Sequence, residues 1–279
     1  MTDAHSKTSY LALRWLLLAA TLCAQQASAE VILHAFNWRY VDVGTQAQAI
    51  RDRGYDSVLV SPPLKSEGAQ WFARYQPQDY RIIDHALGNT EDFRAMSSAL
   101  ENAGLRLYAD VVINHMANES SQRSDLDFPG QRVLDTYAAN PEYYARQRLF
   151  GDLSENLMSS ADFHESRCIT DYNIVAQVQA WRLCNGGSDT GLPDLDDNAR
   201  VIAAQRSYLL ALKQIGVDGF RIDAAKHMTA KHMARVFDRE VLADSFVFGE
   251  IITASGRGHV EFHGFLEPYL NQTTHSAYD

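Results

Sequence analysis

The stretch GFRIDAAKH at residues 219–227 decides the fold of this chain, because it joins a short apolar run to a polar strand end. Amphipathic stretches at residues 90–103 and 199–215 predict helices, and the second follows a cap-forming Asp-Asp-Asn sequence and precedes Gly216. Continuous apolar strands that alternate with helices are typical of a parallel sheet covered on both faces, so the sequence predicts an α/β fold. The other runs of this kind lie at residues 31–36, 57–60, 105–113 and 246–249.

Length and composition exclude several classes of protein. The 279 residues are 46% hydrophobic and 22% charged, which excludes disordered and fibrous proteins. Lys and Arg together number 25 against 35 acids, which gives a net charge of −10, and the basic residues are not clustered. We therefore expect no nucleic-acid partner.

The first 29 residues have the features of a secretory signal peptide. Lys7 and Arg14 precede an apolar run, and Ala27-Ser28-Ala29 has the small-residue pattern of a cleavage site. The run is shorter than the about 20 residues that span a membrane, and an anchor or a buried helix is the alternative. We predict a signal peptide at residues 1–29 and a mature, secreted or periplasmic protein from Glu30 that has no membrane attachment.

Export changes the interpretation of the three cysteines. Removal of Cys23 with the signal peptide would leave Cys168 and Cys184 as a pair in an oxidising compartment. A cross-link over such a short loop stabilises a protein by roughly 3 kcal/mol in the chain-entropy model. We predict a disulfide; the alternative is two free thiols.

Residues 116–192 interrupt the alternation of strands and helices. This interval is rich in Asn, Ser, Asp, Gly and aromatic residues and is too long for a plain loop. We predict an inserted subdomain at 116–192, flanked by core segments at 30–115 and 193–279. The flanks hold about five or six βα units at roughly 30 residues each, so a barrel of eight units would be incomplete.

Two acids end neighbouring predicted strands. Asp223 closes the run at 219–223, and Glu250 follows the run at 246–249, about one βα unit further on. Arg221 points the same way as Asp223 along a strand, so it should lower the pKa of that carboxyl and keep it ionised. Glu250 has apolar neighbours and no adjacent base, which suits a proton donor. Retaining glycoside hydrolysis uses such a pair; the alternative is two structural acids in ion pairs.

An aromatic cluster favours a sugar-binding site. WFARYQP at residues 71–77 follows the second predicted strand, so Trp71 and Tyr75 would lie at the same end of the sheet as both acids. Flat aromatic faces pack on sugar rings, and Trp and Tyr offer a polar edge to hydroxyl groups. A hydrophobic lid over the core is the alternative, and it suits Phe72 better than Tyr75.

Together these motifs resemble the α-amylase family, glycoside hydrolase family 13, over essentially all of residues 31–279. The resemblance implies a (β/α)8 TIM barrel with a domain B inserted after the third strand. It also implies retaining endo-hydrolysis of α-1,4-glucosidic bonds in starch and related glucans. An α-glucosidase, a glucan transferase and a non-catalytic glucan-binding relative are the alternatives. The matching motifs, in the family's order, are SPP at 61–63 with WFARYQP at 71–77, DVVINH at 110–115, LPDLD at 192–196, GFRIDAAKH at 219–227 and FGE at 248–250.

The resemblance assigns roles to individual positions. Asp223 would be the nucleophile and Glu250 the acid/base, with Arg221 orienting Asp223. The side chains of Asn114 and Asp194 and the backbone carbonyls of Arg182 and His227 would bind a structural Ca²⁺, for which oxygen ligands are suitable. The alternative for Asn114 is a turn residue. The substrate-binding positions would be Trp71, Tyr75, His115, Arg221, Lys226 and His227, the last two on the leaving-group side.

One family motif is missing from the sequence. The family carries a third carboxylate in an Asn-His-Asp motif on a later strand, and no such tripeptide occurs among the 279 residues. The chain ends where the sixth strand should begin, so we expect the complete enzyme to be longer and the literal chain to have little activity. We expect the complete enzyme to be a monomer that acts on α-glucan.

Overall fold

The computed structural model describes residues 30–118, 126–253 and 260–278. The chain divides into two compact units, Met1–Val31 and Ile32–Asp279, and the fold belongs to the second unit. The predicted signal peptide lies outside the described residues. Within the described ranges, no helix combines the length and the apolar character needed to cross a membrane.

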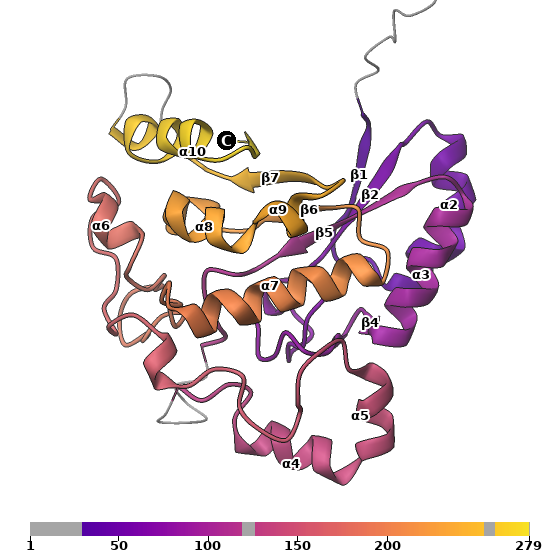
Figure 1. Cartoon of the computed structure of the whole chain (residues 1–279), viewed down its shortest axis with the longest axis horizontal. Coiled ribbons are helices and arrows are strands. Elements are labelled where there is room, and N and C mark those ends of the chain that lie inside the picture. The colour runs from indigo at the N-terminus through magenta and orange to yellow at the C-terminus, as the bar shows by residue number, and fades with distance from the viewer. Residues whose placement is uncertain (1–29, 119–125, 254–259, 279) are drawn as a thin grey trace, which may run out of the picture. The chain divides into compact units, whose positions relative to one another are not determined.

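A sheet of six parallel strands forms the centre of this unit (Figure 1). All five runs predicted as strands form strands, with bounds within two residues of those expected. The predicted parallel α/β fold is therefore confirmed. The sheet is an open half-barrel, and among the described strands the first and the last in its order form its edges. That order is β1 (Ile32–Ala35), β2 (Ser57–Val60), β5 (Arg106–Val111), β6 (Gly219–Ile222), β7 (Phe246–Glu250) and β8 (Ser276–Tyr278).

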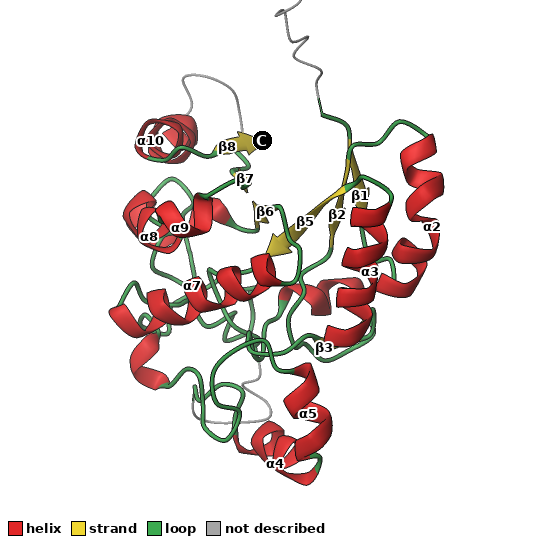
Figure 2. Cartoon of the chain, turned by 45° about the vertical axis from the view of Figure 1, so that its right-hand side comes forward, coloured by secondary structure: helices red, strands yellow, loops and turns green. Residues whose placement is uncertain are grey.

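Helices flank the strands. Figure 2 shows α2 and α3 beside β1 and β2, and α8 and α9 beside β6 and β7. The caps predicted for α7 are present, because Asn198 accepts a hydrogen bond from the Val201 N–H (3.0 Å) and Gly216 has the left-handed φ of 94°. The flanking helices are α2 (Tyr40–Asp52), α3 (Thr90–Asn102), α7 (Ala199–Gln214), α8 (Ala230–Val236), α9 (Arg239–Leu242) and α10 (Glu267–Gln272).

Three short elements lie between β2 and α3. The 3-10 helix η1 (Trp71–Tyr75) carries the aromatic cluster, and β3 (Asp84–His85) pairs with β4 (Gly88–Asn89) in a small antiparallel ribbon. Asn89 then caps α3 through bonds from the N–H groups of Glu91 and Asp92. The ribbon therefore ends at the residue that starts the helix.

The β5–α7 segment, residues 112–198, contains helices but, in its described part, no strand of either sheet. Figures 1 and 2 both show α4 and α5 away from the strands. Cys168 and Cys184 form a disulfide with an S–S distance of 2.11 Å, so the predicted cross-link is confirmed. The elements of the segment are α4 (Gln131–Ala139), α5 (Pro141–Gln147), η2 (Ser160–Asp162) and α6 (Val175–Val178).

A buried ion pair anchors the β5–α7 segment to the loop after β2. Arg81 donates to both oxygens of Asp79 at 2.9 and 2.8 Å, and the two side chains are 2% and 0% exposed. Tyr137 of α4 donates to Asp79 at 3.1 Å, and Arg81 donates to the carbonyl oxygens of Asp152 and Glu155. This network fixes the segment against the part of the chain that carries η1.

Candidate active site

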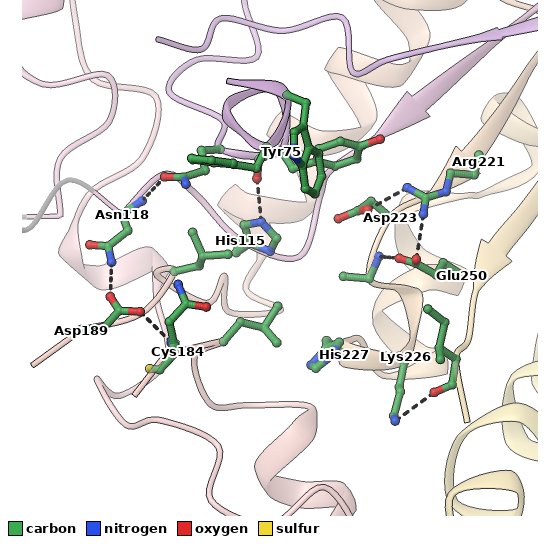
Figure 3. Close-up of a pocket in the computed structure, with 18 of the residues that line it drawn as sticks. Tyr75, His115, Asn118, Cys184, Asp189, Arg221, Asp223, Lys226, His227 and Glu250 are labelled. Carbon is green, nitrogen blue, oxygen red and sulfur yellow. Dashed lines mark hydrogen bonds and ion pairs between the residues drawn. The ribbon is translucent and has the colours of Figure 1, made fainter. Parts of the chain in front are cut away.

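The C-terminal ends of β6 and β7 carry the two predicted acids. Ile222 pairs with Gly249 in the register of these strands, so Asp223 and Glu250 each follow a paired residue. Figure 3 shows both side chains beside Arg221 on one wall of a pocket. The structure therefore brings the two acids together at the end of the strands where barrel enzymes build their sites.

Arg221 is the centre of the charge network at this strand end. Its Nη1 donates to Asp110 and to Asp223 at 2.7 Å each, and its Nη2 lies 3.0 Å from Glu250. The Arg221 side chain is 8% exposed. Three carboxylates thus share one guanidinium in a mostly buried position, and the group carries a formal charge of −2 when all three are ionised. Such an excess of negative charge favours the retention of a proton within the group.

Burial overturns the charge predicted for Asp223. Burial raises the pKa of its carboxyl to about 6, because the opposing effect of Arg221 is smaller and Glu250 adds to the rise. The predicted lowering is wrong because the sequence shows the neighbouring guanidinium but neither the exclusion of water nor the other acids that share it. Glu250 has no basic neighbour in the sequence, but the fold brings Arg221 against it, and the Ala224 N–H donates to its Oε2 at 3.1 Å.

Two partners of Arg221 have no role that the sequence predicts. Asp110 is fully buried, accepts a hydrogen bond from the Tyr75 hydroxyl at 2.9 Å, and has a pKa raised to about 7, mainly by burial. The sequence signal for Asp110 is a charged residue inside an apolar strand. Its partner is visible only in the structure, where the register places Asp110 opposite Arg221. Tyr278 accepts from Arg221 Nη2 at 2.6 Å. No local pattern marks Tyr278, which lies in a strand of three residues.

A cavity of about 840 Å³ opens beside the acids, a volume suited to a small ligand or a stretch of polymer. Trp71 and Phe72 line it and are 56% and 48% exposed, which argues against the alternative of a lid packed over the core. The Trp71 ring lies 6.3 Å from the Tyr75 ring and 5.8 Å from the ring of Phe36, which also lines the cavity. The aromatic wall is therefore accessible from the cavity.

Two histidines predicted to bind substrate lie on the same cavity. The His115 Nε2 is 3.0 Å from the Tyr75 carbonyl oxygen, and the His227 Nδ1 is 3.1 Å from the Val178 carbonyl oxygen. Burial lowers the pKa of both rings, that of His227 to about 4, so both are neutral at pH 7. A neutral ring that donates to a carbonyl through one nitrogen keeps an acceptor nitrogen on the other, which in His115 is Nδ1, 3.3 Å from the side-chain amide nitrogen of Asn114.

The predicted calcium ligands are partly assembled. Asp194 is buried, its Oδ2 lies 2.7 Å from His164 Nδ1, and its Oδ1 has no hydrogen-bond partner. Asn114 and His227 line one cavity, to which neither Asp194 nor Arg182 contributes, and the Arg182 carbonyl already accepts a bond from the Ile169 N–H at 3.1 Å. An unpartnered buried carboxylate oxygen fits a hard cation. Among residues 30–118, 126–253 and 260–278, no three His, Cys, Asp or Glu side chains form a metal cluster.

An open parallel half-barrel with paired acids at its strand ends has the arrangement in which barrel enzymes, glycoside hydrolases among them, build their active sites. Residues 43–272 match the sequence model of a protein family, described as the alpha amylase catalytic domain. The chain is 52% identical over 264 residues to an alpha-amylase of Aeromonas hydrophila. The aligned residues cover 95% of this chain and 57% of that protein. The chain belongs to the alpha-amylase family. It spans about half the length of the curated relatives it matches.

Solved structures show the same fold. The wild-type alpha-amylase I of Eisenia fetida matches with a TM-score of 0.65 and 25% identity, covering 86% of this chain and 47% of that one. A cyclomaltodextrin glucanotransferase matches with a TM-score of 0.68 and 18% identity, covering 90% of this chain and 56% of that one. Both likenesses show that the chain has the fold of the corresponding part of these structures.

Proposed function

We propose that the complete protein is an α-amylase that hydrolyses α-1,4-glucosidic bonds within starch and related glucans with retention of configuration. The observation that carries this proposal is the convergence of Asp223 and Glu250 on Arg221 at the edge of an aromatic-lined cavity. A non-catalytic glucan-binding protein would not need an acid pair at neighbouring strand ends. The relationship to the Aeromonas alpha-amylase supports the same substrate class.

The two acids divide the chemistry between them. Glu250 gives its proton to the glycosidic oxygen while the bond from that oxygen to C1 breaks and an oxygen of Asp223 bonds to C1. Water then attacks C1, Glu250 takes a proton from this water, and the bond to Asp223 breaks, which restores both acids. The geometry supports this division, because Arg221 Nη1 donates to Asp223 at 2.7 Å and Glu250 lies beside the same guanidinium at the neighbouring strand end.

The remaining cavity residues bind the glucan. Trp71 and Tyr75 offer ring faces, His115 binds the sugar at the cleavage point, and Arg221 holds Asp223 in line. Lys226 and His227 line the leaving-group side. Neutral imidazoles suit this task, because an uncharged ring has both a donor and an acceptor nitrogen for hydroxyl groups.

A structural calcium ion is part of the proposal. Asn114 and Asp194 would hold it through their side chains and His227 through its carbonyl, with the Arg182 carbonyl as a further ligand. The unpartnered Oδ1 of Asp194 supports this assignment. When bound, the ion supplies a fixed positive charge that pins the two ends of the β5–α7 segment together, and the chemistry of hydrolysis stays with the acids.

We further propose that residues 1–29 are a signal peptide, that 116–192 form domain B, and that 30–115 and 193–279 belong to the catalytic barrel. The mature protein would be a secreted or periplasmic monomer. The Cys168–Cys184 disulfide supports an oxidising compartment.

The test uses the protein made from its complete reading frame. Proton NMR during hydrolysis of maltoheptaose should show the α-anomer as the first product, and Asp223→Asn and Glu250→Gln should each remove more than about 99% of turnover. The circular dichroism spectra of both variants should match that of wild type. A β-anomer as the first product, or near-normal turnover by either folded variant, would contradict the assignment.

A further inference from the structure

We propose that Glu261 is a positioning residue that holds the Lys226 ammonium group at the wall of the cavity, where that group donates to a hydroxyl of the departing sugar. This inference rests on the proposed function, because it needs a saccharide on the leaving-group side of Glu250.

Lys226 is held by two acceptors from beyond β7. It lies in the turn η3 (Ala225–His227), three residues after Asp223, and its Nζ donates to Glu261 Oε1 at 2.9 Å and to the Ile252 carbonyl oxygen at 3.0 Å. The Lys226 and Glu261 side chains are 10% and 7% exposed. The ion pair therefore joins the turn after the nucleophile strand to the chain that follows the acid/base strand.

Two aromatic rings confine the same ammonium group. The Nζ of Lys226 lies 5.1 Å from the centre of the Phe265 ring and 5.5 Å from that of Tyr172, within range of a cation–π interaction. Phe265 belongs to the π-helix Phe262–Leu266, which directly follows Glu261, and Tyr172 belongs to the β5–α7 segment. Three separate parts of the chain thus fix the position of one flexible side chain.

The geometry leaves one donor for a ligand. An ammonium group carries three protons, and two of them are used by Glu261 and Ile252. Lys226 lines the cavity, whereas Glu261 does not, so Glu261 acts on a bound sugar only through Lys226. Figure 3 places Lys226 beside His227 and below Glu250, on the leaving-group side of the proposed reaction.

A stabilising role alone explains this pair poorly. Replacing a buried ion pair by apolar groups of similar volume is often neutral or stabilising, so such a pair is weak evidence for a contribution to stability. Lysine is a compact charge on a flexible stem, which makes fixed acceptors necessary wherever its position matters. Glu261 and the Ile252 carbonyl provide them.

The experiment compares two substrates that differ on the leaving-group side, using the protein made from its complete reading frame. Maltoheptaose has a departing sugar, and α-maltosyl fluoride has none. Glu261→Gln removes the charge but keeps an acceptor oxygen for Lys226. The ratio of kcat/KM on maltoheptaose to kcat/KM on α-maltosyl fluoride should fall at least severalfold and at most roughly hundredfold, the upper range for a lost hydrogen bond to a charged group. Lys226→Met should lower the same ratio. The double variant Lys226→Met/Glu261→Gln should lower it no further than Lys226→Met, because both residues act through the one contact between Lys226 and the sugar.

The control is Glu267→Gln, a glutamate on the same stretch of chain that is half exposed and paired with His263. It should leave the ratio unchanged. If Glu261→Gln fails to fold, Lys226→Met/Glu261→Leu removes the whole pair and should show the same fall in the ratio. Equal losses on both substrates, or an unchanged ratio in a folded variant, would overturn the inference. Failure of the wild-type protein to hydrolyse either substrate would instead refute the proposed function.

Discussion

Arg81→Met tests how firmly the β5–α7 segment is anchored to the barrel. The substitution keeps much of the volume of the side chain but removes its charge and its hydrogen bonds. Asp79, which is 0% exposed, would lose both bonds from the Arg81 side chain and keep those from the Arg81 backbone N–H and the Tyr137 hydroxyl. Removing one member of a buried ion pair costs about 3–5 kcal/mol, because the remaining charge is left uncompensated.

The assay is equilibrium unfolding in urea, with the midpoint and the slope fitted together. The matched control is Arg132→Met, which breaks the ion pair with Glu67, whose side chains are 59% and 40% exposed. That change should cost less than about 1 kcal/mol. Adding Asp79→Asn to Arg81→Met should recover part of the loss, because it removes the orphaned charge. An Arg81→Met variant as stable as the Arg132→Met control would show that the reasoning from burial is wrong.

Two further predictions concern calcium and pH. If Asp194 binds calcium, the melting temperature should fall on chelation, since a ligand at 100 times its Kd adds about 2.7 kcal/mol, and Asp194→Asn should abolish this response. A wild-type melting temperature that chelator does not move would remove calcium from the account. Because the pKa of Asp223 is raised to about 6 and a nucleophile must be ionised, kcat/KM should fall as the pH drops through about 6. The folded state binds this proton more tightly than the unfolded state, so the stabilisation is complete below about pH 4 and is lost as the pH rises through about 6. Asp223→Asn should therefore gain stability relative to wild type between these values, and a constant difference across them would contradict the raised pKa.

The sequence predicts the strands well, because burial on both faces leaves apolar runs that are visible without any alignment. Residues 57–60 were predicted as a strand and form β2, whose four side chains are all buried. The helix at Ala199–Gln214 was predicted with its cap because Asn198 and Gly216 have specific backbone preferences. The Cys168–Cys184 pair follows from counting the cysteines outside the predicted signal peptide. Each of these signals is local.

The contacts that organise the site are not local. Asp110 meets Arg221 across the β5–β6 register, and Glu261 meets Lys226 from 35 positions away. Neither pair has a spacing that a sequence pattern could predict, because each depends on which strands become neighbours. Periodicity could have suggested that Asp110 is buried, but its partner follows only from the order of the strands in the sheet.

The error over Asp223 shows why sequence neighbours alone do not set the charge of a catalytic group. Arg221 is close to Asp223 in the sequence and in space. Its charge acts to lower the pKa of the Asp223 carboxyl, but burial raises that pKa by more. The same guanidinium also contacts Asp110, which is fully buried, and Glu250, which lines the cavity. Gathering three acids around one base costs folding free energy, and the left-handed φ of 50° at Ala224, which follows Asp223, adds strain. A fold that keeps both features at its strand ends gives up stability there, as expected where a strand end is built for binding or catalysis rather than for folding alone.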